Sequence, residues 1–292
     1  MSISRNKISA YLALCFIPAL SPAQTITGKL SAPLLNEISG AAFSQLNKNI
    51  LYVHNDSGDS SRFFSINTAG ELLTTHVFTA RPNSKLGVLD CEDIAVGPGP
   101  VKGESYIYLA DIGDNFHFRP SVQVYRFKEP ATMQSRDTLK PTVLNLTYPK
   151  GPRDAETIMI DPKEKMIYII SKREDTVGIY RCPLNFNNNS NIVLQDCGKI
   201  FFEGKGKEKW IVAGDISSDG NSVLIKSVSK VYYWQRNGNE PLYKTLQRTP
   251  AIQSRFTSHG QEESIAFAPD GKGYYVMAEG KGTGIYYYTI EK

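Results

Sequence analysis

Residues 90–127 contain the pattern that decides the fold. They read DCEDIAV at 90–96, YIYLAD at 106–111 and VQVYRF at 122–127, with turn residues such as Gly, Pro and Asn between the runs. The first run joins acidic groups to small residues. The other two are rich in the β-branched and aromatic residues that are typical of strands. This stretch therefore predicts three consecutive β-strands.

The same order of runs recurs along the whole chain. The acidic, small-residue run has copies at 37–43, 90–96, 154–160, 215–218 and 261–268. A second run follows each of them, at 50–54, 106–110, 166–171, 222–226 and 274–278. A third run follows at 63–67, 122–127, 177–181, 231–235 and 285–290, and candidate fourth strands lie at 72–79, 142–148, 199–203 and 242–247. Self-similarity of this kind indicates a repeat architecture.

Four strands per repeat and a period of about 54 residues predict an all-β protein, a single β-propeller of five four-stranded blades. The last repeat lacks a fourth strand, and we expect residues 25–30 to supply it and close the ring. Six blades remain an alternative because the segments 128–153 and 236–260 are long. A β-sandwich or irregular barrel is the other alternative, but sandwiches do not repeat one motif order five times.

The N-terminal residues 1–23 have the features of a secretory signal peptide. Arg5 and Lys7 precede an almost wholly apolar run at 8–20, and small residues at 21–23 fit a cleavage site. Residues 24–292 are then the propeller domain, and we expect it to be exported to the periplasm or outside the cell. No later run approaches the roughly 20 apolar residues that span a bilayer.

The charge balance excludes a general polyanion partner. The chain has 33 Lys and Arg against 29 Asp and Glu, and the signal holds two of the basic residues, which leaves 31 − 29 = +2. So small a charge predicts no nucleic-acid binding. We expect a small-molecule or protein ligand in the central funnel, and the oligomeric state stays open.

The cysteines agree with export. Cys182 and Cys197 flank an Asn-rich turn between two apparent strands, and an oxidising compartment allows them to form a local disulfide. Cys91 is then left over, and we expect it to be a buried free thiol.

Carboxylates gather where one rim of the propeller is expected. The first strand of a blade lines the channel and the second runs antiparallel to it, so the start of one meets the end of the other. The acidic residues at these places, with Asp215 expected beside them, give a candidate metal-ligand set: Glu37, Asp56, Asp90, Glu92, Asp111, Glu156 and Glu263. Like charges raise one another's pKa, and a bound cation would neutralise them. Oxygen ligands at scattered positions favour calcium.

The alternative for this ring is structural, as a set of blade-to-blade hydrogen bonds and ion pairs. Two further groups of residues bear on the choice. The candidate general bases are Glu156, Glu92 and His259. The candidate anion-binding residues are Arg153, Lys172 and Lys226, although the two lysines could instead pair with Glu156 or Asp215. The chain contains no Gly-x-Ser-x-Gly, His-Glu-x-x-His, phosphate-binding loop or Cys-x-x-Cys motif.

Several of these motifs together resemble a known family. They include Glu37-Ile38-Ser39-Gly40, His54-Asn55-Asp56-Ser57-Gly58, Asp90-Cys91-Glu92-Asp93-Ile94-Ala95, Asp111-Ile112-Gly113-Asp114-Asn115 and Asp154-Ala155-Glu156. The chain resembles exported bacterial propeller proteins related to the esterase-like and phytase-like groups, over nearly all of residues 24–292. The resemblance implies a propeller with an acidic funnel and transfers no reaction. More remotely, the plan is similar to calcium-dependent propeller phosphoesterases, lactonases and nucleotidases.

The leading hypothesis from the sequence is an exported propeller that binds a divalent cation, calcium, in its funnel and hydrolyses a small ester, lactone or phosphoester there. The competing hypothesis is a non-catalytic binding or scaffold propeller whose acidic ring is structural. Carboxylate oxygens that converge on one point favour the first hypothesis. One-to-one ion pairs favour the second.

Overall fold

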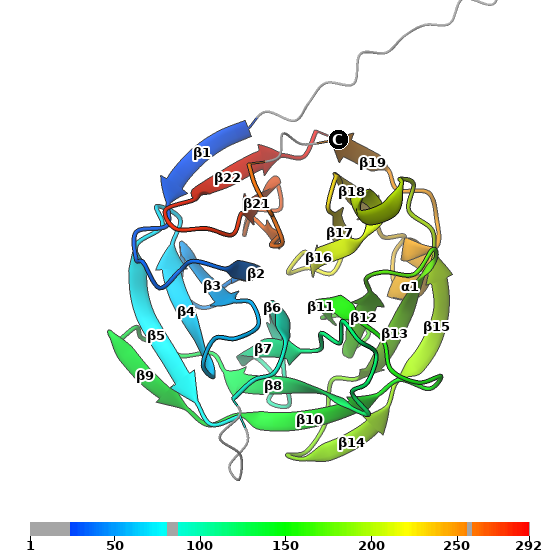
Figure 1. Ribbon diagram of the computed structural model, residues 1–292, viewed down its shortest axis with the longest axis horizontal. Helices are drawn as coiled ribbons and strands as arrows, with labels where there is room; N and C mark the ends of the chain where they lie inside the picture. The colour runs from blue at the N-terminus through cyan, green and yellow to red at the C-terminus, as the bar shows by residue number, and fades with distance from the viewer. Residues whose placement is uncertain (1–23, 81–86, 256–258, 292) are drawn as a thin grey trace, which may run out of the picture.

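The chain folds into five blades around one central channel in a computed structural model, which describes residues 24–80, 87–255 and 259–291 (Figure 1). The predicted five-bladed propeller is confirmed, and six blades are excluded. Strands β2, β6, β11 and β16 lie innermost, around the channel. The predicted signal peptide, residues 1–23, lies outside the described residues. No helix of the described ranges is long and apolar enough to span a membrane.

Each blade is an antiparallel sheet numbered outward from the channel. Blade 1 contains β2 (Ile38–Phe43), β3 (Ile50–Asn55), β4 (Arg62–Asn67) and β5 (Leu72–Phe78). Blade 2 contains β6 (Cys91–Pro98), β7 (Ser105–Asp111), β8 (Val122–Lys128) and β10 (Thr142–Thr147). Blade 3 contains β11 (Ala155–Asp161), β12 (Met166–Ser171), β13 (Val177–Pro183) and β15 (Gln195–Ile200).

The last two blades complete the ring. Blade 4 contains β16 (Ile211–Ile216), β17 (Ser222–Ser227), β18 (Lys230–Gln235) and β19 (Ile252–Arg255). Blade 5 contains β20 (Ala266–Phe267), β21 (Gly273–Met277), β22 (Gly284–Thr289) and the N-terminal strand β1 (Gln24–Lys29). A short 3-10 helix, η1 (Gly206–Lys209), precedes β16.

The N-terminal strand closes the ring as predicted. Strand β1 pairs antiparallel with β22, with Gln24 opposite Tyr288 and Lys29 opposite Gly284 (Figure 1). The two ends of the propeller domain therefore share one sheet. This closure places the first and last blades side by side and leaves no open gap in the ring of sheets.

Deleting residues 24–31 should abolish cooperative unfolding, because blade 5 would lose its outer strand and the ring its closure. Thermal unfolding followed by circular dichroism measures this directly. A truncated protein that melts with the same midpoint and sharpness as the full chain would contradict the structural role of β1.

In each of blades 1 to 4, the connection between the third strand and the outer strand also contacts the preceding blade, and blade 5 precedes blade 1. Strand β9 (Arg136–Leu139) pairs parallel with β5 of blade 1, and β14 (Ser190–Val193) pairs parallel with β10 of blade 2 (Figure 1). Helix α1 (Leu242–Leu246) contacts β15 of blade 3. The β4–β5 turn of blade 1 bonds to the end of β1, where the Lys29 amide donates to the Ala69 carbonyl at 3.1 Å. We call these four segments the straps.

The straps account for one alternative that the sequence left open and for one wrong strand prediction. The long segments that left six blades open, 128–153 and 236–260, contain β9 and α1. Residues 242–247, predicted to be a strand, begin with α1, because Pro241 precedes it and Leu242 and Leu246 bury one face at helical spacing. The outer strand of blade 4 is β19. The outer strand of blade 3 begins at Gln195 instead of residue 199.

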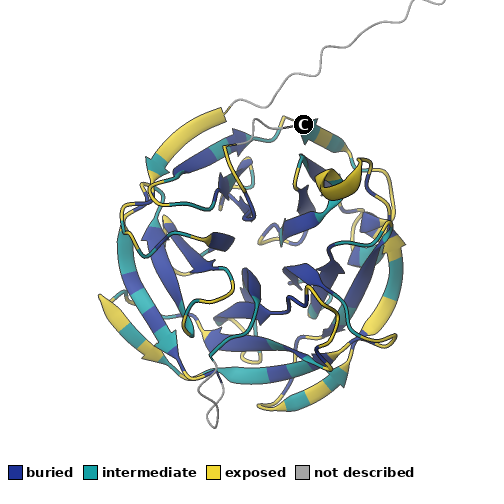
Figure 2. Cartoon of the chain, viewed as in Figure 1, coloured by how far each residue is buried: buried dark blue, intermediate teal, exposed yellow. Residues whose placement is uncertain are grey.

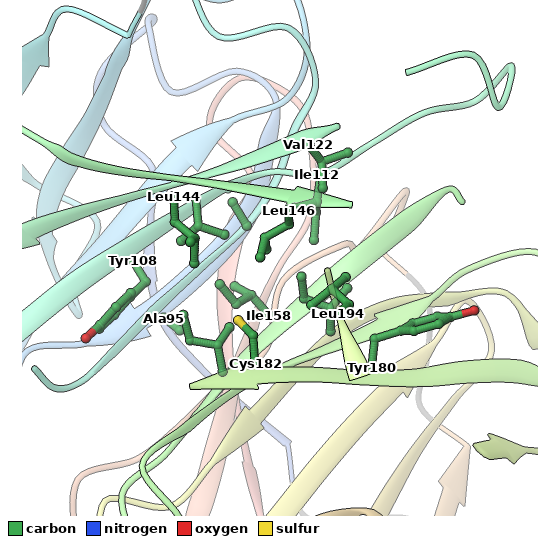
Figure 3. Packing of buried hydrophobic residues seen from close by; sticks show 14 of the residues in the cluster. Ala95, Tyr108, Ile112, Val122, Leu144, Leu146, Ile158, Tyr180, Cys182 and Leu194 are labelled. Carbon is green, nitrogen blue, oxygen red and sulfur yellow. The ribbon is translucent and has the colours of Figure 1, made fainter. Parts of the chain in front are cut away.

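The hydrophobic core is divided into clusters that lie largely between neighbouring blades. The inner strands are buried almost throughout, whereas the outer strands contain many partly buried or exposed residues, and β1 is exposed along most of its length (Figure 2). Between blades 2 and 3, Leu144 and Leu146 of β10 face Ile158 and Cys182 (Figure 3). Packing between blades, together with the straps, holds the first strands in position around the channel.

The predicted Cys182–Cys197 disulfide is wrong in this structure. Cys91, Cys182 and Cys197 are all free thiols. Cys182 packs in the cluster between blades 2 and 3, whereas Cys197 packs against the cluster between blades 3 and 4. The two side chains therefore lie on opposite faces of the blade 3 sheet, an arrangement that a disulfide cannot bridge. Cys91 is buried, as predicted.

Candidate metal centre

A β-bulge begins each inner strand of blades 1 to 4. The pairing of the inner strand with its neighbour shifts register between Cys91 and Asp93 in blade 2, and between Ala155 and Thr157 in blade 3. The skipped residues of the four blades are Ser39, Glu92, Glu156 and Val212. Bulges commonly re-aim a side chain beside a functional site. In blades 2 and 3 the bulge presents a glutamate at the same rim.

Five carboxylates from three blades converge beside these bulges. Oxygens of Asp56, Asp90 and Glu92 lie within 4.8 Å of one another, and so do oxygens of Asp56, Glu263 and Glu279. Asp56, which follows β3, belongs to both groups. The two groups together are called the acidic cluster below. Blades 5, 1 and 2 thus bring together four residues of the predicted ligand set, and the convergence is the arrangement that favours a cation.

The pKa values of three carboxyl groups in the acidic cluster are raised, so their ionisation costs free energy. Burial, then the Asp56 and Asp90 carboxylates, raise the pKa of Glu92 well above its usual range. Burial, then Asp56, raise the pKa of Asp90 to about 6. Burial, then the Glu263 carboxylate, raise the pKa of Glu279 to about 8. Each shift has the direction expected for like charges that share a poorly solvated site.

Glu92 is the buried member of the cluster that lacks a donor. Its exposed fraction is 3%, and no residue in the described ranges donates a hydrogen bond to its carboxylate. A buried carboxylate without partners is costly, so such groups are normally paired or coordinate a metal. The backbone of Gly113 packs closely against it, since a Cβ atom at Gly113 would lie 2.3 Å from Glu92 Oε1 and 2.5 Å from Asp90 Oδ2.

Blade 3 contributes positive charge near the acidic cluster. Lys172, directly after β12, forms a buried ion pair with Glu156, which is the contact that the structural alternative for this lysine expected. The same ammonium lowers the pKa of Glu92, against the larger effect of burial. Its neighbour Arg173 forms an ion pair with Asp154. Glu156 is thus neutralised by Lys172 and does not join the acidic cluster, although its Oε2 is buried and accepts no hydrogen bond from the described residues.

Two other predicted ligands stand apart from the acidic cluster. Asp111 forms a buried ion pair with Arg119 at 2.8 Å and accepts the backbone amides of Leu89 and Asp90, each at 3.0 Å. It therefore orders the loop that carries Asp90. Glu37 is exposed, and its charge adds to those that raise the pKa of Glu279.

The remaining predicted site residues make local contacts. Arg153 pairs with Glu174 at 3.3 Å. Lys226 is fully buried and donates to the Glu262 carbonyl at 2.5 Å, so it links blade 4 to blade 5, and burial lowers its pKa to about 8. His259 contacts the Glu262 carboxylate at 3.1 Å and stacks on the Tyr286 ring at 3.9 Å between centroids.

Asp215 lies deeper along the channel than the sequence analysis placed it. Blade 4 begins its first strand at Ile211, so Asp215 is near the end of β16. Its carboxylate accepts the Phe267 amide of blade 5 at 2.7 Å, and burial raises its pKa to about 7. Asp93 does the same for the Ile158 amide of blade 3 at 2.9 Å. These two aspartates join neighbouring blades, as the structural alternative supposed.

Glu279 is the cluster residue that the predicted ligand set lacks. It follows the second strand of blade 5, at the place that Asp56 occupies in blade 1. That correspondence was visible in the order of the runs. What the sequence does not reveal is which of the rim carboxylates meet, since this depends on the pairing of Asp111 and Glu156 with nearby cations.

Comparison with known proteins identifies distant structural neighbours. No protein-family model matches the chain, and neither does any curated protein. One similar solved structure is a "putative 6-phosphogluconolactonase" from Bacteroides uniformis, with 16% identity, a TM-score of 0.43, and coverage of 90% of this chain and 70% of that one. Another is U3-55K, with 14% identity, a TM-score of 0.41, and coverage of 87% and 68%. Both are remote, so the function below rests on the site alone.

Proposed function

We propose that this protein binds a divalent cation, calcium, at Asp56, Asp90 and Glu92, and hydrolyses a small ester, lactone or phosphoester at that place. The observation that carries the proposal is the carboxylate of Glu92, which is buried, accepts no hydrogen bond from the described residues and lies within 4.8 Å of two further carboxylates. The Gly113 backbone packs directly against it, where any side chain would clash with Glu92 and Asp90. Oxygen ligands from separate loops suit calcium, which accepts six to eight oxygens in flexible geometry.

The chemistry follows from the charges around the acidic cluster. When bound, a cation there would polarise the scissile group and lower the pKa of a water molecule. Glu156 is the general-base candidate that the geometry supports best, since it neighbours the cluster through Lys172 and keeps one oxygen without a donor. Lys172 would compensate negative charge that develops on the substrate.

The competing function is a non-catalytic binding propeller. The contacts that favour it are the bonds from Asp93, Asp215 and Lys226 to the backbone of the next blade, which are structural. These contacts lie outside the acidic cluster and leave the Glu92 carboxylate without a hydrogen-bond donor among the described residues. Export of residues 24–292 remains part of the proposal, and N-terminal sequencing of the secreted protein tests it.

Chelation tests the cation. Adding EGTA to the purified protein should lower its melting midpoint, and calcium should restore it better than magnesium. At a free calcium concentration one hundred times the dissociation constant, calcium binding stabilises the folded state by about 2.7 kcal/mol. This corresponds to a rise of roughly 5–10 °C in the melting midpoint for a domain of this size. A titration up to about 10 mM covers the weak affinities of extracellular calcium modules. A midpoint that neither EGTA nor calcium changes would leave the binding propeller as the better account.

A further inference from the structure

Two exposed phenylalanines stand on the loop that follows β7. The side chains of Phe116 and Phe118 are 83% and 70% exposed, and their rings stack with centroids 6.4 Å apart. Large apolar side chains that are exposed together, within polar surroundings, commonly mark a binding site. The proposed function uses neither of them.

The loop holds these rings in a defined place. The Asp114 carboxylate accepts the amides of Phe118 at 3.0 Å and Arg119 at 2.9 Å. Arg119 donates in turn to the Gly113 carbonyl at 2.7 Å. His117, between the two phenylalanines, has a φ of 54° and donates its amide to the Asp114 carbonyl at 2.9 Å. A surface that is ordered before binding loses little entropy when a ligand arrives.

Asn115 connects this loop to the charged groups of the site. Its side-chain amide donates to Asp90 Oδ2 at 3.5 Å, and its oxygen accepts from Arg173. The Arg173 guanidinium lies 4.5 Å from the Trp210 ring centroid, and the ammonium of Lys207 lies 5.3 Å from it. Asn115 therefore links the acidic cluster to Arg173, and the two exposed phenylalanines follow it in the same loop.

We propose that Phe116 and Phe118 bind the apolar part of the substrate, so that the substrate class is a phosphoester with an alkyl or aryl group. This inference rests on the proposed function, because the anionic group needs the cation at Asp90 and Glu92. The basic side chains of Arg173 and Lys207 complement a phosphate, and the rings next to Asn115 complement a hydrocarbon group. The site thus selects molecules that carry both groups.

The test compares hexyl phosphate with methyl phosphate by isothermal titration of the full-length domain in calcium. Each buried methylene increases affinity roughly fourfold, so burial of two or three should make hexyl phosphate bind at least about tenfold more tightly. The Phe116→Ser/Phe118→Ser variant should lose this preference and keep its affinity for methyl phosphate. Phe201→Ser is the matched control, because Phe201 is 64% exposed on another part of the chain and should keep the preference.

The outcomes separate this inference from the proposed function. An unchanged hexyl preference in the double variant overturns the inference. Methyl phosphate binding that EGTA does not alter overturns the calcium proposal instead, while the loss of hexyl preference still decides the role of the two rings. Binding to phosphatidylcholine vesicles that the double variant abolishes, without any hexyl preference in the wild type, would assign the loop to a membrane surface and also overturn the inference.

Discussion

Replacing Glu92 by glutamine should raise the melting midpoint in EGTA at pH 8 and remove the further rise that calcium produces. Both effects come from the Glu92 carboxylate. Its removal stabilises the calcium-free protein and takes away the stabilisation by calcium. Without a cation, burial and the neighbouring Asp56 and Asp90 charges raise the pKa of Glu92, so its ionised form opposes folding at pH 8. Glutamine has nearly the same shape and carries no charge.

The size of the loss with calcium follows from linkage. Wild-type protein should gain roughly 5–10 °C at calcium one hundred times its dissociation constant, and the Glu92→Gln variant should gain less than about 2 °C at the same concentration. Differential scanning calorimetry in EGTA and in calcium measures all four midpoints. Calorimetric titration of calcium into each protein gives the affinities directly.

Asp215→Asn is the matched control for Glu92→Gln. Asp215 is also a buried carboxylate with a raised pKa, but it lies in the second half of β16 and bonds to the Phe267 amide. Its variant should keep the full calcium response. An equal calcium response in the wild type, Glu92→Gln and Asp215→Asn proteins would show that Glu92 is not a ligand.

Calcium-free protein should lose stability as the pH rises from 6.5 to 8, and calcium should suppress much of that loss. The folded-state pKa of Glu279 is about 8, far above the ordinary value near 4 that it recovers on unfolding. Its stabilising contribution is therefore complete below about pH 4 and disappears as the pH rises through 8. Glu92 acts in the same direction. A cation compensates the charge of the carboxylates once they are ionised. The rise in melting midpoint that calcium produces should therefore grow with pH.

The pH range avoids the histidines, and Asp215, whose pKa of about 7 lies inside it, is outside the acidic cluster and should titrate alike in EGTA and in calcium. Burial lowers the pKa of His54 and His76, which destabilises the fold mainly below pH 6.5. Lys226, with its pKa lowered to about 8, adds an opposite slope above that pH. Midpoints measured at half-unit intervals in EGTA and in calcium provide the comparison. A calcium increment that stays constant from pH 6.5 to 8 would contradict the coupling between cation and carboxylates.

The fold was largely predictable because its signals are local and repeated. Short runs of β-branched and aromatic residues mark the strands, and the absent fourth strand of the last repeat identifies β1 as the closing strand. The errors arose where a short apolar run fits two structures. Residues 242–247 have the composition of a strand, but Leu242 and Leu246 lie one helical turn apart and both are buried. Nothing local indicates that β9 and β14 pair with a preceding blade.

The site was predictable at the level of its rim and less so at the level of its contacts. Asp56, Asp90, Glu92 and Glu263 were expected near one another, and they are. Lys172 neutralises Glu156, and Arg119 neutralises Asp111, through geometry that residue order does not contain. The cysteine error has the same origin, since sequence spacing does not say that Cys182 and Cys197 face different blades.

The straps make the five junctions between blades unequal. Four junctions are covered by a connection from the following blade, but blade 5 receives its outer strand from the chain's beginning and therefore has no such connection to offer blade 4. At that junction the described side chains line a partly open pocket of about 140 Å³, with walls that include Val231, Ile252, Tyr274 and Ile290. A circular permutant that joins the present ends through a linker and opens another turn would create the missing cover.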